Sequence, residues 1–72
     1  MIDLTTREME ILRLVAQGKR NRRISEDLGI ALRTVKHHLE HIYHKAGLTG
    51  YNRIMLIRWA LITKQISLSE LE

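Results

Sequence analysis

Two helical patterns separated by only three residues restrict the fold of this chain more than any other feature. The first pattern spans residues 22–28, with Asn21 as its expected N-cap, and the second spans residues 32–46. Because Gly29 lies in the gap and glycine readily adopts the left-handed backbone that ends a helix, the chain is expected to turn sharply there. A short helix, a tight turn containing glycine and a second helix form a helix-turn-helix.

The longer pattern, residues 32–46, is amphipathic. At about 100° per residue its apolar side chains fall within one arc. They are Leu32, Val35, Leu39, Ile42 and Ala46. Polar side chains project from the opposite side, with Thr34 and Lys36 at its flanks: Arg33, His37, Glu40, His41 and His44. One side of this helix is therefore expected to be buried and the other to contact a polar partner.

A further helix is predicted on each side of this motif. Thr5 and Glu8 have the spacing of a capping box, which predicts a helix over residues 6–17. Asn52 is the expected N-cap of a helix over residues 53–63. Proline is absent and no strand-like alternation persists. The predicted fold class is therefore all-α, a four-helix bundle with a central helix-turn-helix.

The length of the chain allows only one domain, over residues 1–72. Within it, residues 65–72 carry few apolar side chains, so we expect a loosely ordered C-terminal tail.

The composition excludes several classes of protein. The chain contains no cysteine, so it has no disulfide, no thiolate metal site and no cysteine nucleophile. No arrangement of paired carboxylates or of nucleophile and base is evident, and we expect neither an enzymatic activity nor a cofactor. No apolar run reaches about eighteen residues and the first residues lack the order of a signal peptide. The absence of cysteine fits a cytoplasmic location, and we expect no membrane partner and no small-molecule ligand.

The positive charge is concentrated around the short helix. The chain has twelve Lys and Arg against eight Asp and Glu, and four of the cations crowd one stretch: Lys19, Arg20, Arg22 and Arg23. The helix dipole disfavours cations in a first turn, so a sequence shaped by stability alone would favour acids there. This placement favours a polyanionic partner over a merely solvated patch.

The segment 53–63 is apolar nearly all round, which is typical of a helix buried on more than one side. A domain this small cannot easily surround such a helix. We therefore predict that one of its stripes, made of Met55, Trp59 and Ile62, forms a homodimer interface with Trp59 as its anchor. The alternative is that all three belong to the core.

An ordered set of short motifs runs from Leu4 to Ala60. It comprises Leu4-Thr5-x-Arg7-Glu8, Ile11-Leu12, Gly18, Asn21-x-x-Ile24, Thr34-Val35-Lys36-x-His38-Leu39, Ile42, Lys45, Gly47 and Asn52-Arg53. Together these motifs resemble the LuxR-type helix-turn-helix, the C-terminal DNA-binding domain of many response regulators and quorum sensors. One such element would be common by chance, whereas the ordered set is highly specific.

The resemblance implies a sequence-specific transcription regulator that binds double-stranded DNA, with residues 32–46 in the major groove and residues 53–63 pairing two copies. RNA polymerase is a further partner that the resemblance suggests, and the location that it implies is the nucleoid of the bacterial cytoplasm. Carried onto this chain, the positions that contact bases are Arg33, Lys36, His37, Glu40 and His41. Those that contact phosphates are Asn21, Arg22, Arg23, Thr34 and Lys45.

Three positions depart from the family pattern. Ala31 stands where a serine or similar residue usually caps the recognition helix, and the loss of such a cap typically costs about 1 kcal/mol. Ser25 and Ala46 replace apolar residues, which should thin the core.

Two alternatives to this interpretation stay open. One is a helix-turn-helix resembling region 4 of a sigma factor, against which the stretch of residues 34–39 and the apolar segment 53–63 both argue, because a sigma region normally ends soon after its recognition helix. Another is a helix-turn-helix repurposed to bind protein, which could use the apolar segment 53–63 equally well. Separately, His37, His41 and His44 share one helical face and could bind zinc with Glu40. We do not expect a metal site, because three ligands from one helix rarely surround a metal tetrahedrally.

Overall fold

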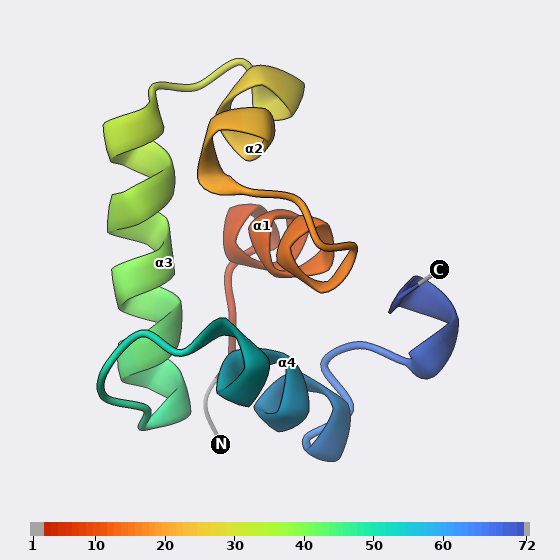
Figure 1. Ribbon diagram of the computed structural model, residues 1–72. Helices are drawn as coiled ribbons and strands as arrows, with labels where there is room; N and C mark the ends of the chain where they lie inside the picture. The colour runs from red at the N-terminus through yellow and green to blue at the C-terminus, as the bar shows by residue number, and fades with distance from the viewer. Residues whose placement is uncertain (1–2, 72) are drawn as a thin grey trace.

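The helical bundle predicted from the sequence is present in a computed structural model of the chain, which describes residues 3–71 (Figure 1). The structure has no strand among these residues, so the all-α prediction is confirmed. The elements in chain order are α1 (Thr6–Ala16), α2 (Asn21–Leu28), α3 (Leu32–Ala46), α4 (Arg53–Ile62) and the 3-10 helix η1 (Leu68–Leu71).

The start of α1 is stabilised by the predicted capping box. The Thr5 hydroxyl accepts from the Glu8 amide at 3.1 Å, and the Thr5 amide donates to Glu8 Oε1 at 2.8 Å. Two otherwise unpartnered amides are satisfied in this way. The helix ends at Ala16, one residue earlier than predicted, and Gly18 follows in the left-handed region.

The start of α2 differs from the prediction. Asn21 is the first helical residue and not the N-cap, which is Arg20, and no side chain caps this helix. The Asn21 side chain is instead engaged by a distant residue, because its Oδ1 accepts from Arg53 Nη1 at 2.8 Å. A tertiary contact that a local pattern cannot reveal has therefore taken the place of the expected cap.

The turn between α2 and α3 is the one the glycine predicted. Gly29 is the C-cap of α2 with φ 66° and ψ 35°, and the Ile30 amide donates to the Ser25 carbonyl at 3.0 Å. Ala31 is the N-cap of α3 and offers no side-chain hydrogen bond. The missing cap inferred from the family pattern is thus a real feature of the α3 start.

The core forms where α1 is surrounded by the other elements. In Figure 1, α1 lies between α2 and α4 with α3 alongside, and α1 contacts all three as well as η1. Fully buried side chains come from every α-helix: Ile11, Leu12, Val15, Ile24, Val35, Ile42, Leu56 and Ala60. Tyr43 is also buried, although its phenol ring was not assigned to the apolar arc of α3 from sequence.

The C-terminal segment contributes to this core. Ile66 is only 4% exposed, and η1 packs against α1. Glu70 Oε1 accepts from Arg13 Nε at 2.8 Å, which adds a polar tie to the same helix. The burial of Ile66 was not expected from the low apolar content of residues 65–72, because a single side chain is enough when the chain folds back onto α1. The loose order of this tail stays a prediction, and Glu72 lies outside the described residues.

Candidate nucleic-acid interface

The face of α3 that points away from the core carries the side chains predicted to read bases. All five are exposed: Arg33, Lys36, His37, Glu40 and His41. The opposite side of the same helix buries Val35, Leu39 and Ile42. The rings of His37 and His41 lie together, with centroids 4.6 Å apart. The predicted division of α3 into a buried and an exposed side is therefore confirmed.

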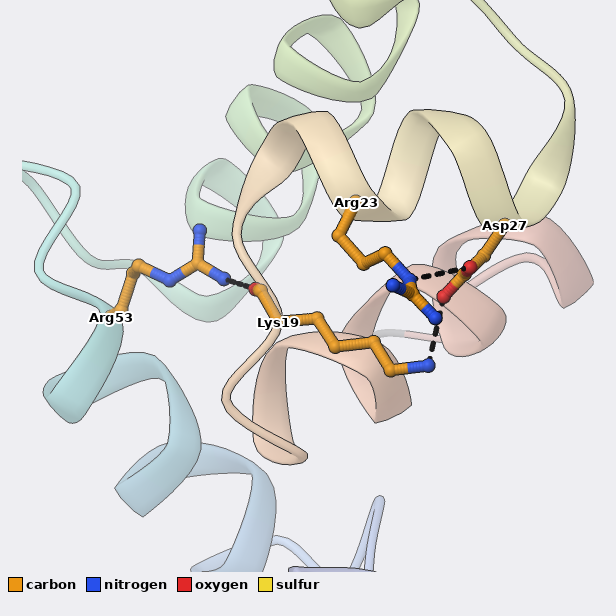
Figure 2. A network of polar contacts seen from close by, with 4 residues as sticks. All are labelled: Lys19, Arg23, Asp27 and Arg53. Atoms are coloured by element: carbon orange, nitrogen blue, oxygen red, sulfur yellow. Dashed lines mark hydrogen bonds and ion pairs between the residues drawn. The ribbon is translucent and has the colours of Figure 1, made fainter.

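Two of the basic residues around α2, Lys19 and Arg23, are partly neutralised by Asp27 (Figure 2). Asp27 accepts from Lys19 Nζ at 2.8 Å through Oδ2 and from Arg23 Nε at 2.9 Å through Oδ1. The hydrogen bond from Lys19 and the contact with Arg23 hold the pKa of Asp27 below its ordinary value. Arg22 is exposed, and none of the ion pairs within residues 3–71 includes it. Its guanidinium is thus free to meet an external anion.

Thr34 and Lys45 lie at opposite ends of α3. Thr34 is half-buried in the first turn, beside the α2–α3 turn. Lys45 is in the last turn and its Nζ lies 2.7 Å from Glu8 Oε1. It also donates to the Asp3 carbonyl at 3.3 Å. The ammonium predicted to contact a phosphate is therefore already held by partners within the chain.

Glu8 is a buried carboxylate, 3% exposed, at the contact between α1 and α3. Burial alone would raise the pKa of this carboxyl. The hydrogen bonds from Lys45 and Thr5, together with the charge of Lys45, outweigh that effect and lower the pKa of Glu8 below 4.5. The carboxylate therefore stays ionised and pins the last turn of α3 to the start of α1.

Arg53 was not assigned a role from the sequence beyond matching the start of a helix. Its Nη1 donates to Asn21 Oδ1 at 2.8 Å, and its Nη2 donates to the Lys19 carbonyl (Figure 2). These contacts span 32 and 34 residues of the chain. Only the packing of α4 beside the start of α2 brings them together, and no local sequence signal could have shown them.

A groove of about 350 Å³ lies between α3 and the starts of α2 and α4, on the side of α3 that carries Lys36 and Glu40. It is lined by Asn21, Lys36, Leu39, Glu40, Tyr43, Tyr51 and Arg53. The Tyr43 hydroxyl is buried with no hydrogen-bond partner in residues 3–71, and burial raises the pKa of this phenol. The structure thus brings together Asn21, predicted to contact a phosphate, with two of the predicted base-reading side chains.

The three residues predicted to form a homodimer interface gather on one side of α4. Met55 is 40% and Ile62 66% exposed, whereas Trp59 is half-buried. With Leu48 and Arg58 they line a shallow depression. The alternative that all three belong to the core is wrong for this chain, since Leu56 and Ala60 take that position on the other side of the helix.

Two other kinds of site were sought within residues 3–71. No group of three His, Asp or Glu side chains is placed to hold a metal ion there, and so the zinc alternative built on three histidines gains no support. None of the helices in this part of the chain combines the length and apolar character needed to cross a membrane.

Comparison with known proteins places this arrangement in a family. Residues 3–60 match the family described as GerE, "Bacterial regulatory proteins, luxR family". The chain belongs to the luxR family. Membership implies DNA binding and a role in transcription regulation, and it favours the LuxR-type assignment over a sigma-factor region.

Individual relatives agree with this assignment of the LuxR-type domain. It is 52% identical over 42 residues to "Transcriptional regulatory protein LiaR" of Bacillus subtilis (strain 168), which is 58% of this chain and 20% of that protein. It is 41% identical over 61 residues to "Oxygen regulatory protein NreC" of Staphylococcus aureus (strain JH9), and the match covers 85% of this chain and 27% of that protein. It is also 41% identical over 54 residues to "Putative HTH-type transcriptional regulator MT0914" of Mycobacterium tuberculosis, and the match covers 75% of this chain and 6% of that protein.

The LuxR-type domain therefore corresponds to about a quarter or less of these relatives. The matched length describes one regulatory module, and it leaves the remaining parts of those longer proteins without a counterpart in the 72 residues.

Proposed function

We propose that this LuxR-type domain is a sequence-specific regulator that places α3 in the major groove of double-stranded DNA. The observation that carries the proposal is the row of exposed polar side chains along α3, opposite a side that buries Val35, Leu39 and Ile42. A helix presented in this way fits the width of the major groove, where each base pair offers a distinct pattern of donors and acceptors.

Within this proposal Lys36 and His37 read bases. An ammonium can donate to O6 or N7 of guanine, and the exposed side chains of Arg33, Glu40 and His41 lie along the same face. Glu40 is suited to accept from the amino group of cytosine.

Phosphate contacts are assigned to the start of α2 and the first turn of α3. Arg22 is exposed without an ion pair in residues 3–71. Asn21 and Arg23 lie in the same turn of α2, and Thr34 lies in the first turn of α3. Such contacts set the register of a helix-turn-helix on the duplex. Lys45, which the resemblance also assigns to a phosphate, is held by Glu8 in the free domain, as Arg23 is held by Asp27.

The proposal includes a homodimer on DNA. The exposed side chains of Met55 and Ile62 flank Trp59, and a second copy that covers this surface would remove apolar area from water. Two-fold pairing would place two copies of α3 on an inverted repeat, with half-sites about one helical turn apart.

We also propose where the domain acts and in what kind of protein. The relatives are longer proteins that are named as regulatory proteins. This supports the proposal that the domain belongs to a bacterial response regulator, which acts in the cytoplasm and contacts RNA polymerase.

Selection of bound sequences from a random duplex library tests the proposal. We expect an inverted-repeat motif, and the logarithm of the affinity should fall against the logarithm of salt with a slope of about −7 if each domain neutralises four phosphates. Failure to enrich any motif, with weak binding only at low salt, would contradict sequence-specific recognition.

A second function, a helix-turn-helix that binds another protein, is favoured by the exposed apolar surface of α4 alone. It predicts weak DNA affinity at every salt concentration together with a stable hetero-complex. The same library experiment, followed by measurement of complex formation with RNA polymerase, separates the two functions.

A further inference from the structure

The guanidinium of Arg53 joins the first residue of α4 to the start of α2. It donates through Nη1 to Asn21 Oδ1 at 2.8 Å and through Nη2 to the Lys19 carbonyl, and both contacts are partly buried. Because a guanidinium is planar and its donors have a fixed geometry, two bonds to two separate groups define an orientation as well as a distance.

One acceptor, Asn21, is the first residue of α2, and the other, the Lys19 carbonyl, lies in the connection that precedes this helix. Besides these contacts, the start of α2 is held by the burial of Ile24 in the core. The N-cap of α2 is Arg20, and no side chain accepts from the first amides of the helix. An isolated helix of eight residues is unstable in water, so the position of α2 depends on tertiary contacts.

The last turn of α2 is also bound to the connection between α1 and α2, through Asp27. The Lys19 side chain reaches Asp27 at 2.8 Å, and Arg23 reaches the same carboxylate at 2.9 Å (Figure 2). Lys19 therefore accepts from Arg53 through its carbonyl and donates to Asp27 through its ammonium. Arg53 and Asp27 together hold the connection between α1 and α2 from both sides.

We infer that Arg53 is a positioning residue for DNA binding: it holds the start of α2, and with it Arg22, in the place from which that turn meets the phosphates. The inference rests on the proposed function. Arg53 acts through Asn21 and Lys19, since its guanidinium already donates to both and is half-buried. It also lines the groove shared with Lys36, so the held turn lies next to the base-reading face.

The test is Arg53→Lys in the 72-residue chain, because lysine keeps the charge and loses the two-point contact. We expect amide hydrogen exchange in α2 to accelerate about tenfold, including at Ile24, whose amide donates to the Arg20 carbonyl at 3.0 Å. Exchange in the middle of α3, at Leu39, should stay unchanged. Affinity for the selected DNA should fall by about tenfold with the salt slope unaltered, since no charge is lost.

Arg7→Lys is the matched control, because the one ion pair of Arg7 within residues 3–71 is its contact with Glu10 at 3.9 Å, on α1. It should alter neither α2 exchange nor DNA affinity. Asn21→Ala serves as a second variant that leaves Arg53 intact, and it should also accelerate exchange in α2. Added to Arg53→Lys, it should produce little further acceleration, since both changes remove the same contact.

Two results would overturn the inference. One is an α2 exchange rate in Arg53→Lys equal to that of the control. The other is a loss of affinity without any change in α2 exchange, which would make Arg53 a direct DNA contact. If the unmutated chain selects no DNA motif while Arg53→Lys still accelerates α2 exchange, then the proposed function fails and the anchoring of α2 stands.

Discussion

Lys45 Nζ lies 2.7 Å from Oε1 of Glu8, and this ion pair joins the last turn of α3 to the first turn of α1. The same carboxylate accepts from the Thr5 amide in the capping box. One buried group therefore stabilises the start of a helix and fixes the end of the helix proposed to enter the major groove. Its partner Lys45 is about one-third exposed, so the charge pair is only partly removed from water.

Replacing Glu8 should lower the stability of the whole domain. Glu8→Ala removes a capping acceptor and leaves Lys45 without its partner, and we expect the free energy of unfolding to fall by about 1–3 kcal/mol. Urea denaturation measures the change. Glu10→Ala is the control, because its exposed contact with Arg7 at 3.9 Å should contribute less than about 0.5 kcal/mol. Equal effects of the two substitutions would contradict a special role for Glu8.

The same residue predicts how stability depends on pH. The pKa of Glu8 is lowered from 4.5 in the folded chain, so the unfolded state binds the proton more readily. The stabilisation is complete above pH 4.5 and is lost as the pH falls through the folded pKa. Unfolding measured at several acidic pH values should show a shallower loss in Glu8→Gln than in the unmutated chain. Parallel curves would exclude Glu8 as a source of the acid sensitivity.

Ile62 offers a test of the homodimer that spares the core, because its side chain is 66% exposed. Ile62→Ser should leave the unfolding transition nearly unchanged and weaken pairing on an inverted repeat by about tenfold. The strength of pairing is measured from the gel mobility of DNA complexes that hold one copy or two copies of the domain. Ile54→Ser is the matched control, since Ile54 is 77% exposed on the same helix and lies outside the Met55–Trp59–Ile62 stripe. Cooperative binding that survives Ile62→Ser would place the interface elsewhere.

Lys36 and Arg22 should differ in how they affect recognition. Lys36→Ala is expected to lose about 1–3 kcal/mol of discrimination at one base position, because a base contact is sequence-dependent. Arg22→Ala should weaken binding to all sequences alike and reduce the salt slope by about one for each domain. Affinities for the selected site and its single-base variants distinguish the two. A uniform loss in Lys36→Ala would show that Lys36 contacts the backbone.

Signals within a few residues were enough to predict most of the helices. Thr5 and Glu8 cap α1, Asn52 caps α4 through hydrogen bonds to the Ile54 and Met55 amides, and Gly29 ends α2. Capping and helical periodicity act over three or four residues, so they can be recognised in the sequence itself. The exposed face of α3 followed from the same periodicity.

What the sequence by itself determined was therefore the set of helices, their apolar faces and the motif order that marks the luxR family. Only the tertiary structure decided which charged and amide side chains pair with residues distant in the sequence. Asn21 was expected to cap α2 and instead meets Arg53, and the ammonium of Lys45, whose phosphate contact stays a prediction, lies against Glu8. These pairs are separated by 32 and 37 residues. Their formation depends on how whole helices pack, since long polar side chains take whichever partner the packed core brings within reach.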